Sequence, residues 1–251
     1  MPRREVPGGA IAADATGREA AFFDVDGTLV ATHIVHQFVH VRRWLAGGGD
    51  WRFRLWLAFF YARCLRYAYL DRVSRTRMNI AFYRNYAGLD AKRVREAARD
   101  CLERVLRPNL YREALACVTD HVRRGHRIVL VTGSIDFLIE PLAGHLREVC
   151  GCKAGIDVVA RTLVVRDGRF TGELDGAPLG ESEKARELAA YAERVGIDLA
   201  RSCAYGDSVA DVPMMGCVGH ATAVNPRRAL RAIAHRRGWS CVTWSLPRNR
   251  G

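Results

Sequence analysis

The sequence has no long uninterrupted run of apolar residues. Across its 251 residues, no window approaches the roughly 18 consecutive apolar residues that a membrane-spanning helix needs. The N-terminal stretch carries arginines, but it lacks the apolar segment that follows the basic start of a secretory signal. We therefore expect a cytoplasmic protein in which residues 1–18 form a flexible N-terminal tail.

Lysine is scarce, although basic residues are abundant. Lys92, Lys153 and Lys184 are the only lysines among 39 basic residues, so the other 36 are arginines; with 27 acidic residues the formal charge is +12. The arginines are dispersed, and no zinc-finger spacing, RNP motif or basic zipper accompanies them. Their excess reflects either GC-rich codon usage or a preference for anionic ligands. We expect no nucleic-acid partner, and an arginine-rich nucleic-acid-binding protein is only a remote alternative.

Paired metal-binding cysteines are missing as well. Several of the eight cysteines lie inside apolar runs of a long chain, which favours reduced core thiols over disulfides. Cys150 and Cys152 have neither a second cysteine pair nor nearby histidines, so we predict no zinc site there.

Short apolar runs alternate with helical patterns over most of the chain. This alternation predicts an α/β fold, with a Rossmann-like parallel sheet covered by helices on both faces. Ligands of such sheets bind at the carboxyl ends of the strands, where polar turns follow the runs here. The predicted strands are 20–26, 127–134, 156–160, 202–208 and 219–225, and the predicted helices are 111–124, 136–148, 182–196 and 226–236.

Residues 34–110 interrupt this alternation. The segment is mostly helical in pattern and rich in aromatic residues and arginine, so we predict a helical cap inserted into a core formed by 19–33 and 111–251. An insertion at this edge of the sheet would lie over the ligand crevice as a lid. A second insertion at 161–174 alternates and turns at Asp167-Gly168, which predicts a β-hairpin.

Aspartates follow two of the predicted strands. Asp24 and Asp26 lie two residues apart, so an extended chain would place both carboxylates on one side. Asp207 and Asp211 come after a later strand. An oxygen-only set of this kind suits Mg²⁺. The alternative is that Asp24 and Asp26 only cap the turn that follows them.

Two further features fit a phosphate ligand. The hydroxyls and backbone N–H groups of Thr132, Gly133 and Ser134, at the end of the second strand, can bind a phosphate, although such residues are commonly helix caps. Lys184 begins a helix in a chain that uses arginine for nearly every other cation. A compact ammonium group suits pairing with both a carboxylate and a phosphate oxygen.

Four motifs in this order resemble the haloacid dehalogenase superfamily: DVDGTL at 24–29, the hydroxyl at 132, Lys184, and GDSVAD at 206–211. The resemblance covers roughly residues 20–225. The helical insertion is similar to the C1 cap of the phosphoserine-phosphatase-like subfamily, so the resemblance implies a Mg²⁺-dependent phosphatase.

The resemblance also implies roles for these residues. Asp24 would attack phosphorus and form an aspartyl-phosphate, and Asp26 would be the general acid and base. Mg²⁺ would be held by Asp24, the backbone carbonyl of Asp26, and Asp207. Asp211 would be a further ligand through water, or would orient Lys184. Thr132 and Lys184 would neutralise the phosphoryl oxygens.

The sequence departs from this subfamily at one substrate position. Phosphoserine phosphatases similar to this chain have a glutamate that meets the substrate's amino group, whereas His33 stands here. A histidine is a poor partner for an ammonium group, which argues against phosphoserine itself. Either His33 or His36 faces the leaving group, or the two histidines touch nothing.

The aromatic and arginine-rich segment 51–72 has three interpretations. It is a cap helix with aromatics packed inward and arginines in solvent, a surface that lies on anionic lipid, or a source of arginines for a second anionic group of the substrate. The leading hypothesis is a phosphomonoester hydrolase for a small organic phosphate. The alternative is a phosphatase for a lipid-linked or amphiphilic phosphate at a membrane surface. The sequence gives no indication of an oligomeric state.

Overall fold

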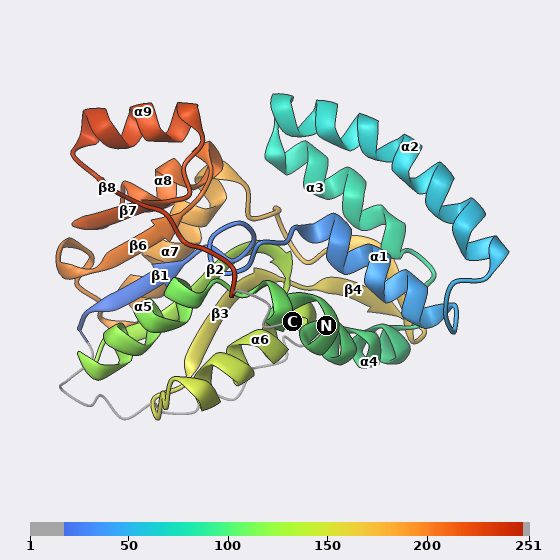
Figure 1. The fold of residues 1–251 in the computed structure, drawn as a ribbon, viewed down its shortest axis with the longest axis horizontal. Coiled ribbons are helices and arrows are strands. Elements are labelled where there is room, and N and C mark those ends of the chain that lie inside the picture. The colour runs from blue at the N-terminus through green and yellow to red at the C-terminus, as the bar shows by residue number, and fades with distance from the viewer. Residues whose placement is uncertain (1–17, 248–251) are drawn as a thin grey trace, which may run out of the picture.

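A computed structural model describes residues 18–247 of the chain (Figure 1). The predicted tail at 1–18 lies outside the described residues except for Arg18. No helix in the described part is both long and apolar enough to cross a membrane.

The core is a six-stranded sheet in the order β3-β2-β1-β6-β7-β8, and every neighbouring pair is parallel. The predicted α/β fold is therefore confirmed. All five predicted strands are present, and the edge strand β8 is additional, because its three residues form no apolar run. The strands are β1 Ala20–Phe23, β2 Arg127–Ile135, β3 Ile156–Arg161, β6 Cys203–Gly206, β7 His220–Val224 and β8 Ser240–Val242.

Alternating side chains of the strands build a separate core on each face of the sheet. Phe23 packs on one face with α5 Arg112–Arg123 and α6 Asp136–Val149. Phe22 packs on the other face with α7 Glu181–Val195, α8 Val212–Met215 and α9 Arg228–Arg237. Because both faces of the sheet are covered, the central strands β1 and β2 are almost entirely buried, and this explains their nearly continuous apolar sequences.

The insertion between β1 and β2 is helical, and Figure 1 shows it beside the sheet, next to the loop that follows β1. The chain returns to the core where the backbone N–H of Tyr111 donates to the carbonyl of Leu29 at 3.0 Å. The insertion consists of α1 Ile34–Leu45, α2 Trp51–Val73, α3 Arg75–Tyr83, η1 Arg84–Tyr86, α4 Ala91–Cys101, η2 Leu102–Leu106 and η3 Arg107–Asn109.

The second insertion is the predicted hairpin. Strands β4 Leu163–Arg166 and β5 Arg169–Leu174 are antiparallel, and the turn residues Asp167 and Gly168 have φ values of 50° and 74°. Two positive φ angles are those of the tight hairpin turn that an Asp-Gly pair favours. The hairpin packs on the helical insertion, because the N–H of Phe170 donates to the carbonyl of Leu89 at 2.9 Å.

Candidate active site

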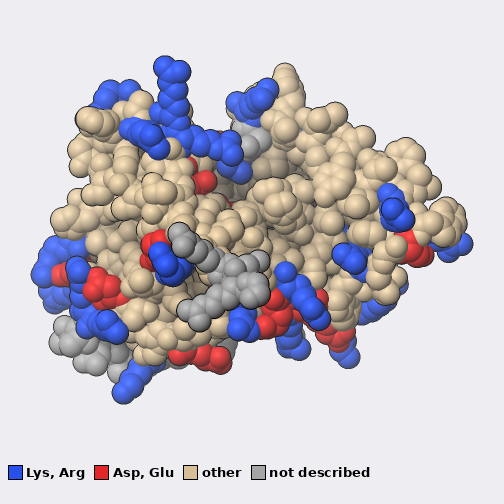
Figure 2. Space-filling view, in the orientation of Figure 1, with Lys and Arg blue, Asp and Glu red and all other residues tan. Residues whose placement is uncertain are grey.

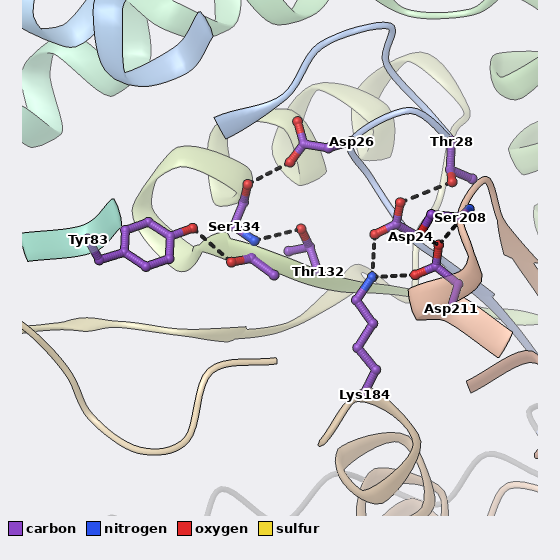
Figure 3. Close-up of polar contacts among 10 residues, drawn as sticks. Asp24, Asp26, Thr28, Tyr83, Thr132, Ser134, Lys184, Ser208 and Asp211 are labelled. Atoms are coloured by element: carbon purple, nitrogen blue, oxygen red, sulfur yellow. Dashed lines mark hydrogen bonds and ion pairs between the residues drawn. The ribbon is translucent and has the colours of Figure 1, made fainter. Parts of the chain in front are cut away.

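A buried lysine joins two aspartates at the carboxyl edge of the sheet. Asp24 is the first residue after β1, and its Oδ1 accepts a hydrogen bond from Lys184 Nζ at 2.6 Å. The same Nζ donates to Asp211 Oδ1 at 2.6 Å, as Figure 3 shows. Burial alone would lower the pKa of Lys184, but the two carboxylates raise it above its ordinary value. Lys184 is therefore a fixed cation, held from α7 between the ends of two strands.

Asp211 is itself held in place by the turn in which it lies. Its Oδ2 accepts hydrogen bonds from the N–H of Ser208 at 3.1 Å and from Ser208 Oγ at 2.8 Å. Burial would raise the pKa of Asp211, but Lys184 and these hydrogen bonds keep it below its ordinary value. Asp211 stays ionised and orients the ammonium group.

Asp26 lies apart from this ion-paired cluster. Its Oδ2 accepts from Ser134 Oγ at 2.6 Å, and its Oδ1 accepts from Gln37 Nε2 at 2.7 Å. Burial raises the pKa of Asp26 to about 7; the Ser134 hydrogen bond opposes this rise and the charge of Asp24 adds to it. Asp26 can therefore exchange a proton near neutral pH, whereas Asp24 is tied to a lysine.

Three aspartates form a cluster that fits a hard divalent cation. Ligand oxygens of Asp24, Asp207 and Asp211 all lie within 4.8 Å of one another. Burial and the neighbouring charge of Asp24 raise the pKa of Asp207 to about 8, so a cation is needed to keep this carboxylate ionised at neutral pH. The side chain of Asp26 is outside the cluster, and its predicted contribution is its backbone carbonyl. An all-oxygen set with several carboxylates is the donor chemistry of Mg²⁺.

A glycine makes room for Asp207. Gly27 has φ +88°, and a Cβ at this position would lie 2.3 Å from Asp207 Oδ2. The glycine of the DVDGT turn thus supplies both a left-handed backbone conformation and the close approach of two loops that are far apart in sequence.

The predicted phosphate-binding residues line the same cavity, but they lie within the last part of β2 and not in a turn after it. Thr132 Oγ1 accepts from the N–H of Ser134 at 3.0 Å, so its hydroxyl hydrogen is left for another acceptor. The backbone of Gly133 is held in place by Tyr83, whose hydroxyl donates to the Gly133 carbonyl at 2.8 Å. The hydroxyl of Ser134 was predicted to bind a phosphate, but in the structure it donates to Asp26. All three predicted residues line the cavity, and Ser134 also adjusts Asp26.

His33 precedes α1 and lines the cavity, and its ring stacks on His36 with centroids 3.9 Å apart. Although His33 as a whole residue is exposed, the partial burial of its ring and the charges of His36 and Arg75 lower its pKa to about 4. The imidazole is therefore neutral at pH 7, and of the two histidines it is His33 that lines the cavity.

Sequence reasoning missed the residues that α3 contributes. Arg75 and Asn79 line the cavity, and Asn79 is only 2% exposed, with no hydrogen-bond partner for its Nδ2 among the described residues. Gln37, which holds Asp26, was missed too. None of these follows a strand, so no local pattern marks them; a buried polar residue within a helical apolar pattern was the only signal present.

The cavity lies between the core and the helical insertion. Its accessible volume is about 70 Å³, and its acidic floor is Asp24, Asp26, Asp207 and Asp211. Figure 2 shows a hollow between the two parts of the molecule, with acidic atoms inside it and basic side chains at its rim. Such an arrangement can bind a cation and an anion together.

Comparisons with known proteins agree on one family. The model of haloacid dehalogenase-like hydrolases matches residues 21–216. The chain is 33% identical over 233 residues to a probable phosphatase of Mycobacterium tuberculosis, covering 92% of this chain and 77% of that protein. It is 30% identical over 232 residues to the phosphoserine phosphatase SerB1 of the same organism, and the match covers 91% of this chain and 72% of that protein. A solved structure from Bordetella pertussis, of unknown function, matches with a TM-score of 0.73 and 27% identity over 90% of this chain and 99% of that one.

Proposed function

Because this chain belongs to the haloacid dehalogenase-like hydrolase family and is a phosphoserine-phosphatase-like phosphatase, we propose that it hydrolyses a small organic phosphomonoester through an aspartyl-phosphate on Asp24. The arrangement of Asp24, Lys184 and Asp211 beside a separately held Asp26 carries this proposal. One carboxylate is fixed and ion-paired, and the other exchanges a proton near pH 7, which is the division of labour that the reaction needs.

In the first step, an oxygen of Asp24 attacks phosphorus in line with the leaving group. The new bond joins the carboxylate oxygen to phosphorus, and the bond between phosphorus and the ester oxygen breaks. Asp26 donates its proton to the departing alkoxide. A pKa of about 7 means that a large share of Asp26 holds this proton at neutral pH.

In the second step, a water attacks the aspartyl-phosphate and Asp26 takes its proton. The acyl-phosphate bond breaks, phosphate leaves, and Asp24 is restored as a carboxylate. Gln37 and Ser134 hold Asp26 in one position during both transfers. The same carboxyl group therefore returns to its starting protonation state after each turnover.

The remaining residues stabilise charge. Lys184 orients Asp24, and Thr132 can donate its free hydroxyl hydrogen to a phosphoryl oxygen. Asp24, Asp207, Asp211 and the backbone carbonyl of Asp26 would hold Mg²⁺, which supplies positive charge opposite the phosphoryl oxygens when bound.

The insertion is proposed to act as the lid and to choose the leaving group. The cavity is small, and its lining includes His33, Arg75 and Asn79. A neutral His33 cannot balance an ammonium group, so we expect phosphoserine to be a poor substrate even though a relative is named as its phosphatase. An uncharged or anionic leaving group fits better.

Phosphate release from p-nitrophenyl phosphate and from a metabolite panel that includes phosphoserine tests the proposal. We expect turnover that needs added Mg²⁺, disappears with chelator and falls to background in Asp24→Asn. Arg236→Gln, an exposed change on α9, should behave as wild type. Activity that persists in Asp24→Asn with chelator present would overturn the mechanism.

A further inference from the structure

Helix α2 presents an apolar stripe to solvent along its whole length. Each of its members is more than half exposed, with values from 52% for Leu55 to 77% for Leu65. Most of them follow one another at intervals of four residues, the spacing of one helix face. We call this stripe the outer α2 face, and it consists of Trp51, Leu55, Phe59, Leu65, Tyr69 and Val73.

The opposite side of α2 already has its partner. Phe53, Phe60 and Tyr67 are buried there, and Phe60 packs against Phe38 at a centroid distance of 5.4 Å. The core of the insertion therefore uses one apolar side of the helix and leaves the other uncovered. Exposed large apolar side chains gathered along one element indicate an interaction surface.

Basic residues accompany this surface. Five exposed arginines lie on α2, and the only acidic residue in its sequence is Asp71. On a helical wheel Arg54 and Arg72 fall on one side of the stripe, Arg52 and Arg63 fall on the other, and Arg66 falls within its edge. In Figure 2 the edge of the molecule that α2 forms is largely uncharged, with isolated basic groups.

This combination favours a lipid surface over a second copy of the chain. Pairing two outer α2 faces would bring two sets of arginines together, and their repulsion opposes such a dimer. An anionic bilayer instead offers acyl chains to the apolar stripe and phosphates to the flanking guanidinium groups, which can extend on their apolar stems to the headgroups. Trp51, Tyr61 and Tyr69 are residue types that suit the bilayer interface.

We propose that the outer α2 face docks this protein on anionic bilayers as a peripheral membrane protein. The docking surface lies on α2. The next helix, α3, carries Arg75 and Asn79, which line the active-site cavity. The interaction does not depend on the phosphatase reaction, since none of the outer-face residues lines the cavity.

Sedimentation of the full chain with vesicles tests the docking. The vesicles are phosphatidylcholine alone, or phosphatidylcholine mixed with phosphatidylglycerol, each at low and high salt. We expect binding only to the mixed vesicles and at least tenfold weaker partitioning at high salt, because salt screens the arginines. Two variants should each partition onto the mixed vesicles at least tenfold more weakly than wild type. One is the double variant Phe59→Ser/Leu65→Ser, and the other is the triple variant Arg54→Gln/Arg66→Gln/Arg72→Gln.

Matched controls separate docking from folding and from catalysis. Val149→Ser and Arg236→Gln change an exposed apolar and an exposed basic residue on the core, and both should bind as wild type. Hydrolysis of a soluble phosphate ester should be the same in all these variants. No binding to mixed vesicles, or binding that the α2 variants leave unchanged, would overturn the proposal, as would a wild-type dimer in solution that Phe59→Ser/Leu65→Ser dissociates.

Discussion

At the scale of single residues, two carboxylates of one short motif have opposite environments. Asp24 accepts from a lysine that cannot lose its proton at neutral pH, whereas the donors to Asp26 among the described residues are the neutral groups of Ser134, Gln37 and Thr32. Burial raises the pKa of both carboxyl groups, but at Asp24 the charge of Lys184 opposes this rise, whereas at Asp26 hydrogen bonds from neutral groups are the main opposition. Asp24 and Asp26 both follow β1, but their chemistry differs because their partners come from different elements. Asp24 is paired with a lysine of α7, whereas Asp26 is held by side chains of β2 and of the insertion.

Asn79 is expected to bind the substrate. Its Nδ2 is buried beside the cavity and has no hydrogen-bond partner in residues 18–247, which is a costly arrangement unless a ligand supplies an acceptor. A hydrogen bond to a charged group contributes about 1.5–3 kcal/mol, so Asn79→Ala should lower kcat/KM by about tenfold to a hundredfold. Steady-state kinetics with a soluble phosphate ester measure this effect.

The thermal stability of Asn79→Ala provides the control. Because Nδ2 is paired with no group in the described part of the chain, the melting temperature of Asn79→Ala should fall less than it would on the loss of a buried hydrogen bond. An unchanged kcat/KM would show that Asn79 does not contact the substrate.

At the scale of elements, the hairpin supports the insertion through a close backbone contact. A Cβ on Gly172 would lie 3.0 Å from Arg84 Cα and 3.2 Å from the Arg84 carbonyl, where neither backbone atom can give way cheaply. Gly172→Ala should therefore cost about 1–3 kcal/mol and separate β5 from η1. Hydrogen exchange should rise in 84–91 and 163–174, while β1 and β2 stay protected.

Gly168→Ala is the matched control for that change. Gly168 also has a positive φ, 74°, but a Cβ there would meet nothing within 4 Å. The difference between the two variants isolates the steric contact from the backbone strain that they share. If Gly168→Ala increases exchange in 84–91 as much as Gly172→Ala does, the close contact is not what holds the hairpin.

A histidine makes the packing of α5 on the sheet sensitive to pH. His121 Nε2 bonds with the hydroxyl of Tyr205 at 2.8 Å, and its Nδ1 bonds with His126 Nδ1 at 2.9 Å. Burial and the charges of His126 and Arg124 lower the pKa of His121 from 6.5 to about 4. The unfolded chain therefore takes up this proton first, and stability is lost as the pH falls from about 6.5 to about 4.

Denaturant unfolding of wild type and His121→Gln at several pH values measures this contribution. It amounts to about 3 kcal/mol at most, and the glutamine variant should lose that much less stability over the same range. Parallel curves for the two proteins would mean that His121 does not titrate in this way.

At the scale of the whole molecule, the parallel sheet could be predicted because the apolar runs alternate with helical patterns, and all of these runs except 156–160 end in a polar or glycine-containing turn. Thr132, Asp207 and the DVDGT aspartates converge for that reason, and Lys184 reaches them from the first turn of α7. The contact of Gln37 with Asp26 and the burial of Asn79 beside the cavity depend on how α1 and α3 fold back over the sheet, and no short-range pattern encodes this return. The outer α2 face was visible as composition, but only the fold shows which of its aromatic residues are left without a partner.

The same scale contrasts a basic molecule with an acidic site. The chain carries a formal charge of +12, yet four aspartates line one small cavity with Lys184 and Arg75. Most of the arginines lie outside the cavity, so they do not neutralise its four carboxylates. A bound divalent cation would relieve this local repulsion, so the metal should affect stability as well as turnover.

Mg²⁺ and Asp207 should accordingly act in opposite directions on folding. Without metal, folding makes Asp207 take up a proton that the unfolded chain does not hold at neutral pH, so Asp207→Asn should raise the unfolding free energy by on the order of 1 kcal/mol. With Mg²⁺ at about a hundred times its Kd, wild type should gain about 2.7 kcal/mol, and the variant should gain much less because it has lost a ligand. Melting curves of both proteins with and without Mg²⁺ measure the two effects, with Ca²⁺ and monovalent salt of matched ionic strength as controls. Equal stabilisation of the two proteins by Mg²⁺ would place the ion somewhere other than the Asp24, Asp207 and Asp211 cluster.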